Sequence, residues 1–244
     1  MTKLTVILPA AGKGTRLNLP YPKEILRIDE KKALIDNSFD LFKGLDRNDV
    51  EFIVVINEDK TEIIKYLSKY KSQYNVSFTY QSPEELEYTG AIKSAQHLFG
   101  DNNIVLLPDT LLTMPKGVNL ADRVNSYLEN DGFCFLFKAE TDVSMLKTKG
   151  CLQVDDNLRV LDYEDKPSEN ITKFNGYWCA FAFKKEVFHE CITFMEQSTL
   201  KLIPPKNVIE QTSIYRSQVI QVDEYKDLGT WDEIGKLLSR NHSS

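Results

Sequence analysis

Ile7 to Lys23 read ILPAAGKGTRLNLPYPK, an apolar strand that breaks into small and cationic residues. Thr5 to Leu8 predict a buried strand. Ala10 to Thr15 are small or glycine apart from one lysine, so the backbone there can lie directly against a ligand. Exposed N–H groups in such a turn bind anions, and Lys13, Arg16 and Lys23 add positive charge nearby. The stretch therefore predicts a site for a phosphate chain.

Two familiar phosphate-binding loops do not fit this stretch. A P-loop needs an upstream glycine and then Gly-Lys-Ser/Thr, but position 7 is Ile and Gly14 follows Gly12-Lys13. A dinucleotide fingerprint needs a third small residue where Leu17 stands, and an acid after the next strand, which ends in Ile56-Asn57. The loop therefore belongs to neither class.

Composition limits the function classes. The 244 residues are 42% hydrophobic, enough for a substantial core, and the net charge of -6 argues against general nucleic-acid binding. The four cysteines form no CxxC pair and lie among apolar residues, which indicates reduced core thiols. The sequence shows no charged-then-apolar leader and no membrane-spanning run, so we expect a cytoplasmic protein with a small anionic partner and no membrane or nucleic-acid partner.

The first half of the chain alternates strands with helices. This alternation is typical of a mostly parallel sheet covered by helices, an α/β fold whose ligands bind at the carboxyl ends of the strands. The expected strands are 4–8, 52–56, 76–81, 104–107 and 133–137, and the expected helices are 34–42, 60–70, 91–99 and 120–129.

The second half changes character. Residues 151–154 and 158–163 flank the turn-forming cluster Asp155-Asp156-Asn157 and predict a β-hairpin. If Asp156 and Asn157 are the central turn residues, Gly150 pairs with Tyr163. The elements expected after the hairpin are a strand over 177–183, helices over 185–197 and 207–215, a strand over 218–222 and a helix over 231–238. No linker divides the chain, so we expect one domain, 1–244, with a half over about 1–138 and a half over about 139–244.

Five motifs, in order, resemble those of the sugar-1-phosphate nucleotidyltransferases. The first is Leu-x-Ala-Ala-Gly-x-Gly-Thr-Arg from Leu8, with Pro-Lys at Lys23. The others are Gln81 with the segment Gly90-Ala91-Ile92-Lys93-Ser94-Ala95, the strand-end Asp109, Glu164 and Lys166 with Asp165 between them before Pro167, and the Asp-x-Gly-Thr motif at Asp227. Asn175-Gly176-Tyr177 resembles the strand start that follows the fourth motif.

The resemblance implies a Rossmann-like central sheet and a first half that binds nucleotide. The nucleotide-binding residues it implies are Leu8, Ala10, Ala11, Gly12, Lys13, Gly14, Thr15, Gln81 and Gly90. A hairpin-containing second half would bind the sugar phosphate through Gly150, Glu164, Lys166 and Asn175. It also allows a homo-oligomer, as in many members of the family.

The implied reaction is attack by a sugar-phosphate oxygen on the α-phosphorus of a nucleoside triphosphate, with release of pyrophosphate. Because two anions must meet, catalysis consists mainly of charge neutralisation and positioning. Arg16 would hold the departing phosphates, Lys23 would meet charge at the α-phosphate, and Asp109 and Asp227 would hold Mg²⁺.

Three interpretations remain open. The first is a sugar-1-phosphate nucleotidyltransferase that prefers UTP or dTTP. The second is a cytidylyltransferase acting on a polyol, choline or other non-sugar phosphate, because only six residues separate Arg16 from Lys23. The third is a nucleotide-sugar-binding regulator without catalysis, which the presence of all four charged candidates disfavours.

Overall fold

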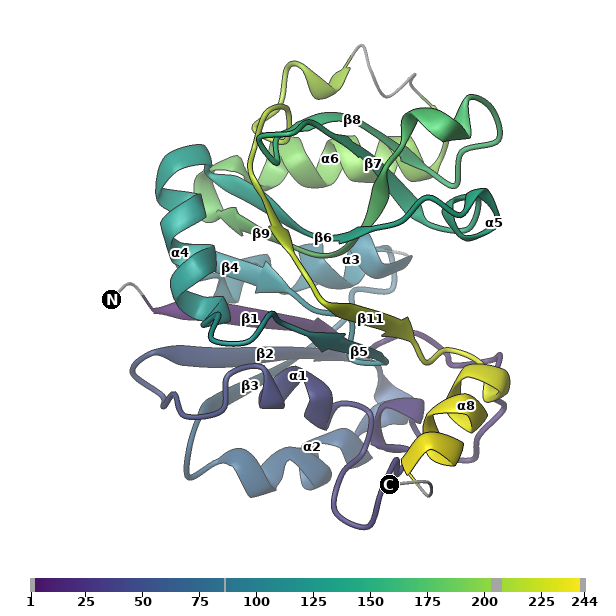
Figure 1. Ribbon diagram of the computed structural model, residues 1–244. Helices are drawn as coiled ribbons and strands as arrows, with labels where there is room; N and C mark the ends of the chain where they lie inside the picture. The colour runs from purple at the N-terminus through teal and green to yellow at the C-terminus, as the bar shows by residue number, and fades with distance from the viewer. Residues whose placement is uncertain (1–2, 86, 203–207, 242–244) are drawn as a thin grey trace. The chain divides into compact units, whose positions relative to one another are not determined.

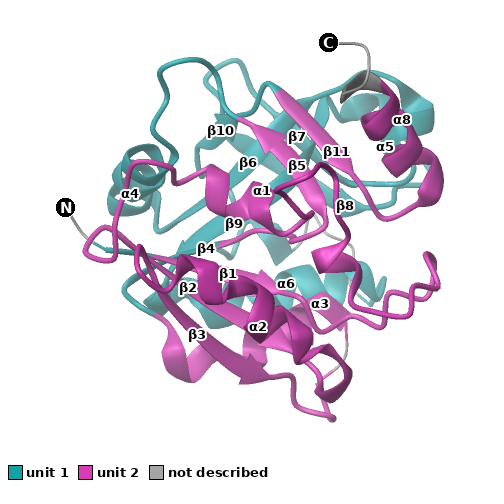
Figure 2. Ribbon diagram, turned by 90° about the horizontal axis from the view of Figure 1, so that it is seen from below, with its two compact units in different colours: residues 1–4, 100–104, 114–223 teal, residues 5–99, 105–113, 224–244 magenta. Residues whose placement is uncertain are grey.

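The computed structural model describes residues 3–85, 87–202 and 208–241. The chain divides into two compact units that interleave along the sequence (Figure 2). Unit 1 comprises residues 1–4, 100–104 and 114–223, and unit 2 comprises residues 5–99, 105–113 and 224–244. The sequence instead predicts a nucleotide-binding half over about 1–138 and a sugar-binding half over about 139–244. This division by function stays a prediction.

Unit 2 is built on three neighbouring strands, in the order β1-β2-β3. They are β1 (Leu4–Pro9), β2 (Val50–Ile56) and β3 (Asn75–Tyr80) (Figure 1). β2 and β3 run parallel, with Phe52 opposite Val76 and Ile56 opposite Tyr80. Runs of buried β-branched and aromatic residues form β1 and β2, as expected for strands covered on both faces. Their carboxyl ends therefore lie at one edge.

Short helices accompany these strands. A stack of aromatic rings on Phe39 packs α1 against the sheet, with Phe52 and Tyr70 each 4.1 Å from it between ring centroids. The helices of unit 2 are α1 (Asp36–Asp40), α2 (Glu62–Leu67), α3 (Glu87–Ser94) and α8 (Trp231–Asn241), with 3₁₀ helices at Lys23–Ile25, Glu58–Lys60, Ser68–Tyr70 and Gln96–Leu98.

A second, two-stranded sheet in unit 2 joins distant parts of the sequence. β5 (Thr110–Thr113) pairs antiparallel with β11 (Glu224–Asp227), and Asp227 lies opposite Thr110. The sequence patterns did not predict either strand, because both are only four residues long and neither TLLT nor EYKD alternates polar with apolar side chains. This pairing brings the end of the chain beside Asp109.

Unit 1 contains both parallel and antiparallel strand pairs. β6 (Phe133–Ala139) pairs parallel with β10 (Val219–Gln221) and antiparallel with β9 (Gly176–Lys184). Its other elements are β4 (Asn102–Val105), α4 (Leu120–Asp131), α5 (Val143–Leu146), β7 (Gly150–Val154), β8 (Val160–Asp165), a 3₁₀ turn at Ile171–Lys173, a 3₁₀ turn at Lys185–Val187 and α6 (Phe188–Thr199).

The predicted hairpin is present as β7 and β8, but the predicted pairing of its two strands is wrong. Gly150 lies opposite Asp165, not Tyr163. The Asp155 N–H bonds the Arg159 carbonyl and Leu158 has φ +60°, so the loop has three residues with the last in the left-handed region. A bulge after Gln153 adds the second residue of the shift.

The α/β class is confirmed, and most of the predicted elements occur within a few residues of their expected bounds. The helix expected over 207–215 starts at a residue outside the described part of the chain, and residues 210–216 form turns. All four cysteines are free and buried, as expected. Among the described residues, no helix has both the length and the apolar character needed to cross a membrane.

Candidate functional site

A cavity of about 1170 Å³ lies within unit 2. Its walls come from the loop after β1, the segment after β2, the end of β3, the start of α3, and the turns beside β5 and β11. This volume is slightly above the range of about 300 to 1000 Å³ usual for small-molecule sites, so a ligand of nucleotide size fits. The wall includes Arg16, Lys23, Gln81, Asp109 and Asp227, five residues expected from the sequence to act together.

The loop after β1, residues 10–15, is called the glycine loop, and residues 11–15 of it line this cavity. Gly14 has φ +64°, a conformation that favours glycine. A Cβ added at Gly12 would meet no atom within 4 Å among the described residues, so packing against them does not require a glycine there. In the described part of the chain, the N–H groups of Ala11 to Thr15 donate no hydrogen bond to protein acceptors. These donors are available to an anion, as the sequence predicts.

Two side chains from the segment after β2 hold the base of the loop. The Asn57 amide donates to the Ala11 carbonyl at 2.6 Å, and the Lys60 amine donates to the Ala10 carbonyl at 2.7 Å. The Ala10 N–H bonds the Val55 carbonyl at 2.8 Å, which continues the pairing of β1 with β2. The loop is therefore fixed where it leaves the sheet.

Lys60 also pairs with the carboxylate of Glu24. The Lys60 amine and Glu24 Oε1 are 2.7 Å apart, and the two residues are 5% and 1% exposed. Burial raises the pKa of the Glu24 carboxyl, which the nearby Lys60 ammonium opposes. Burial likewise lowers the pKa of Lys60, against the effect of the Glu24 carboxylate. Each charge therefore depends on the other to remain in the interior.

Backbone pairing brings the two aspartates together. The Leu106 N–H bonds the Ile7 carbonyl at 3.0 Å, so the segment leading to Asp109 runs beside β1. The Leu228 N–H bonds the Asp109 carbonyl at 3.0 Å. A Cβ built on Gly229 would lie 2.9 Å from Asp227 Oδ1 and 3.9 Å from Asp109 Oδ2. Both carboxylates thus border one small space.

The two expected catalytic cations lie at the same place. Arg16 Nη1 is 3.5 Å from the same Cβ position on Gly229. Lys23 forms an ion pair with Asp109, and their side chains are 19% and 18% exposed. The stem of Lys23 lies 3.8 Å from the Cβ position on Gly14, so it runs alongside the glycine loop. Cations and carboxylates alternate here, as a phosphate and a metal ion together require.

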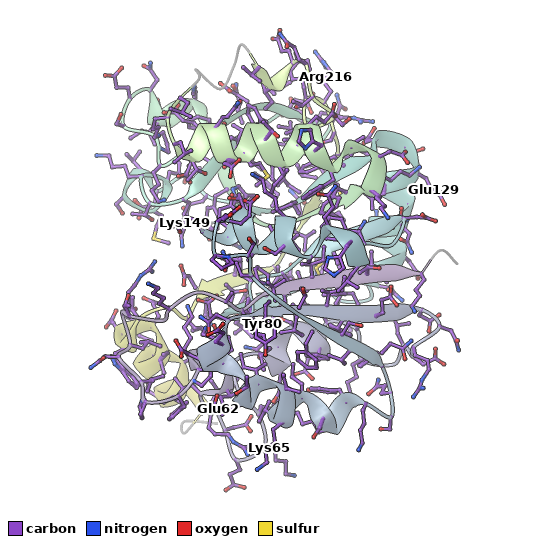
Figure 3. The ribbon with its side chains drawn as sticks, turned by 180° about the vertical axis from the view of Figure 1, so that it is seen from behind. Glu62, Lys65, Tyr80, Glu129, Lys149 and Arg216 are labelled. Carbon is purple, nitrogen blue, oxygen red and sulfur yellow. The ribbon has the colours of Figure 1, made fainter. Side chains whose placement is uncertain are left out.

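Gln81 and the acidic segment after it, which includes Glu85 and Glu87, form another wall of the cavity. The Gln81 side-chain amide donates to the Glu85 carbonyl at 2.7 Å and to the Glu87 carbonyl at 3.2 Å. Both amide hydrogens are therefore engaged, and Oε1 is left as an acceptor. Tyr80, labelled in Figure 3, ends β3 and also lines the cavity. Its exposed fraction is 55%.

Three expected nucleotide-binding residues do not line the cavity. Leu8 and Ala10 are fully buried, and Gly90 is buried where a Cβ would lie 2.5 Å from the backbone of Glu85. Gly90 is therefore needed for packing, because a side chain there would collide with the backbone of Glu85, which lies against α3. A binding role for these three residues stays a prediction. The remaining expected residues of the loop, Ala11 to Thr15, all line the cavity.

The residues expected to bind the sugar phosphate lie in unit 1. Gly150 and Asp165 pair in the hairpin, with Glu164 and Lys166 on either side of Asp165. Lys166 has φ +47°, is 61% exposed, and lies 3.2 Å from the Asp165 carboxylate. Glu164 lies 3.7 Å from the Lys173 amine. Their roles stay predictions.

Gly150 and Asn175 have structural duties in unit 1. A Cβ on Gly150 would lie 2.0 Å from Trp178 Nε1, so the indole packs directly on this glycine. The Asn175 amide donates to the Val154 carbonyl at 2.6 Å and accepts from its N–H at 2.9 Å. Asn175 therefore acts as a backbone clamp on β7.

Sequence reasoning missed the residues that support the loop. In the sequence, Asn57 served only to exclude a dinucleotide fingerprint, which needs an acidic residue at that place. Lys60 is followed by the buried Ile63 and Leu67 at helical spacings of three and seven, so a helical pattern places it on the buried face. That spacing was a usable signal, because a lysine at a buried position needs a partner.

The comparisons with known proteins agree with this geometry. Residues 4–242 match the model of the family described as nucleotidyl transferase. The chain belongs to the nucleotidyl transferase family. It is therefore an enzyme of the nucleotidyltransferase class, and the resemblance drawn from the motifs is confirmed at this level.

Solved nucleotidyltransferase structures share the fold of the whole chain. A UDP-glucose pyrophosphorylase from Acinetobacter baumannii is 18% identical, with 98% of this chain and 93% of that chain covered and a TM-score of 0.74. A UDP-glucose pyrophosphorylase complexed with UDP-glucose is 17% identical, with 100% and 99% covered and a TM-score of 0.73. At these identities the likeness shows the fold.

One curated relative matches part of the chain. The bifunctional protein GlmU of Thermodesulfovibrio yellowstonii is 32% identical over 109 residues, which are 45% of this chain. The matched region spans about a quarter of that relative, 23% of its length.

Proposed function

We propose that this nucleotidyltransferase transfers a nucleoside monophosphate from UTP or dTTP to a sugar 1-phosphate, with release of pyrophosphate. The observation that carries the proposal is the cavity of unit 2, where free loop N–H groups, two cations and two carboxylates converge. This donor set matches the needs of phosphoryl transfer, in which positioning and charge neutralisation provide most of the rate.

The loop binds the triphosphate through its backbone. The N–H groups of Ala11 to Thr15 donate to phosphate oxygens, and Lys13 adds charge from the exposed side of the loop. Arg16 offers a planar fork of donors to the departing β- and γ-phosphates. Lys23 neutralises charge that develops at the α-phosphate during attack. A sugar-phosphate oxygen attacks the α-phosphorus in line with the departing pyrophosphate, so no covalent enzyme intermediate is needed.

Asp109 and Asp227 fit a magnesium ion shared with the triphosphate. Both carboxylates border one space, and carboxylate and phosphate oxygens suit Mg²⁺. Among the described residues no group of three or more metal-ligating side chains occurs, so these two aspartates are the side chains that would hold the ion. When bound, the ion neutralises phosphate charge. Asp109 also forms an ion pair with Lys23, which holds the Lys23 amine beside the carboxylates.

Gln81 favours a base with a ring N–H. Its amide hydrogens are engaged by backbone carbonyls, so it meets a ligand as an acceptor. Uracil and thymine present a donor at ring N3, whereas cytosine presents an acceptor there. This difference supports UTP or dTTP over CTP. For the second substrate, we assign Gly150, Glu164, Lys166 and Asn175 of unit 1 to the sugar phosphate, on the motif resemblance.

The test is pyrophosphate release by the purified protein with five nucleoside triphosphates against a panel of sugar 1-phosphates and polyol phosphates. We expect release that requires UTP or dTTP together with one sugar 1-phosphate, and that chelation of divalent metal abolishes. Release only with CTP and a polyol or choline phosphate contradicts the assignment. Nucleotide binding without release under every condition indicates a binding protein that lacks catalysis.

A further inference from the structure

The buried pair Glu24–Lys60 lies beneath the loop and outside the cavity wall. One ammonium group, at 2.7 Å from each, bonds both the Glu24 carboxylate and the Ala10 carbonyl. Glu24 Oε2 is buried and has no hydrogen-bond partner among the described residues. A pair that is expensive to desolvate and incompletely bonded contributes little to stability. Its arrangement points instead to a role in the geometry of the site.

Lys60 sets the direction of a peptide group. The chain has no cis peptide among its described residues, and in a trans peptide the C=O and N–H point in opposite directions. Because the Ala10 carbonyl points to the buried Lys60, the Ala11 N–H points the other way. Ala11 lines the cavity, so this N–H is aimed at a ligand there. Asn57 acts in the same way on the next peptide, through the Ala11 carbonyl.

Glu24 connects the same ammonium to the segment that carries Lys23. The two residues are adjacent in one 3₁₀ helix, yet Glu24 is 1% exposed while Lys23 lines the cavity. The Glu24 backbone carbonyl also accepts the Ile35 N–H at 2.9 Å. With its carboxylate and its carbonyl both held, Glu24 fixes the backbone from which Lys23 extends.

We propose that Lys60 is a positioning residue which, with Glu24, holds the phosphate-binding loop and Lys23 in one fixed arrangement. This inference rests on the proposed function for its catalytic consequence. Donors held in place before the substrate arrives stabilise developing charge better than donors that must reorganise. Loss of the pair therefore slows turnover more than the accompanying loss of stability explains.

The test variant is Lys60→Met with Glu24→Gln, so that no unpaired charge remains buried. The control is Lys69→Met with Asp36→Asn. Lys69 and Asp36 are also 2.7 Å apart in unit 2, Asp36 is 1% exposed, and neither residue lines the cavity. The Lys69 side chain is 38% exposed, and Asp36 also accepts hydrogen bonds from the Tyr66 and Tyr70 hydroxyls. The control thus removes a carboxylate–lysine pair of the same unit without touching the loop.

Two readouts separate positioning from stability. The first is tryptic cleavage after Lys13 and Arg16 without any ligand, at a temperature where each variant is equally folded. We expect at least about tenfold faster cleavage in the Lys60 variant than in the control, because cleavage requires local opening of the loop. The second is turnover, where we expect kcat to fall by a factor of about 10 to 100 in the Lys60 variant and to stay near wild type in the control.

Equal loop cleavage in the two variants overturns the inference. So does faster cleavage in the Lys60 variant with kcat equal to that of the control. If the wild-type protein releases no pyrophosphate with any substrate, the proposed function fails, while ligand-free cleavage still decides whether Lys60 positions the loop.

Discussion

In unit 2 the backbone N–H groups of residues 11–15, which are expected to bind phosphate, belong to residues that line a cavity, and the described part of the fold does not use them. The N–H groups of Ala11 to Thr15 have no acceptor in the described part of the protein, and Gly12 borders open space. In unit 1 the corresponding residues also serve the fold, since Gly150 carries the Trp178 indole and the Asn175 amide clamps Val154. A motif residue thus has two separable explanations, ligand binding and packing, and the structure distinguishes them residue by residue.

The largest effect should follow the loss of a cation in unit 2. Lys23→Ala removes the amine assigned to the α-phosphate, and we expect turnover to fall by a factor of about 100 to 1000 with little change in melting temperature. Steady-state kinetics and thermal melting check both parts. Lys43→Ala is the control, because Lys43 is an exposed lysine of the same unit and does not line the cavity.

A lysine-to-alanine substitution in unit 1 tests whether the two units bind different substrates. We expect Lys166→Ala to raise KM for the sugar phosphate while KM for the triphosphate changes little, because Lys166 is 61% exposed and is assigned to the acceptor alone. Near-normal turnover by Lys23→Ala, or equal effects of Lys166→Ala on both KM values, breaks the proposed division of roles.

A pair of glycine substitutions tests packing against binding directly. Gly150→Ala places a methyl group 2.0 Å from Trp178 Nε1, so we expect a loss of about 1 to 3 kcal/mol in the free energy of unfolding. Gly12→Ala meets no atom within 4 Å and has an ordinary φ, so we expect no comparable loss of stability but weaker triphosphate binding. Urea unfolding measures the first quantity, and KM for the triphosphate measures the second.

The reverse pattern would contradict the reading of both sites. If Gly12→Ala unfolds readily and Gly150→Ala is as stable as wild type, the loop is structural and the hairpin glycine is not constrained by the indole. Substitution at Gly235, which also meets no atom within 4 Å and lies in α8, supplies a control for the general effect of replacing a glycine with alanine.

The sequence predicted well what depends on local pattern. Buried runs such as Phe52 to Ile56 and the small residues of the glycine loop have the periodicity and composition that determine their structure. The link between Asp109 and Asp227 was predicted only by resemblance, because the strands that join them are four residues long and their pairing is non-local. The hairpin register was wrong because a left-handed Leu158 is not a residue that signals a turn.

The duties of individual side chains were the least predictable part. Whether Asn175 faces a ligand or a backbone depends on where Val154 lies, and that follows from the register of β7 on its neighbours. Lys60 shows the converse, since its role depends on a carboxylate 36 residues away in the sequence. Tertiary contacts of this kind leave almost no local signature.

The smallest expected effect uses the cysteines, which all lie in unit 1. Burial raises the pKa of the Cys151 thiol to about 12, so its thiolate is scarce at neutral pH and labelling requires local opening. Cys151 lies opposite Glu164 in the hairpin, whereas Cys134 lies in β6. We expect a bound sugar phosphate to slow maleimide labelling of Cys151 by about two- to fivefold and that of Cys134 less, since a ligand stabilises the closed state by mass action. Mass spectrometry of labelled peptides measures both rates in one sample. Slowing by the triphosphate alone, with none by the sugar phosphate, would remove the hairpin from the acceptor site.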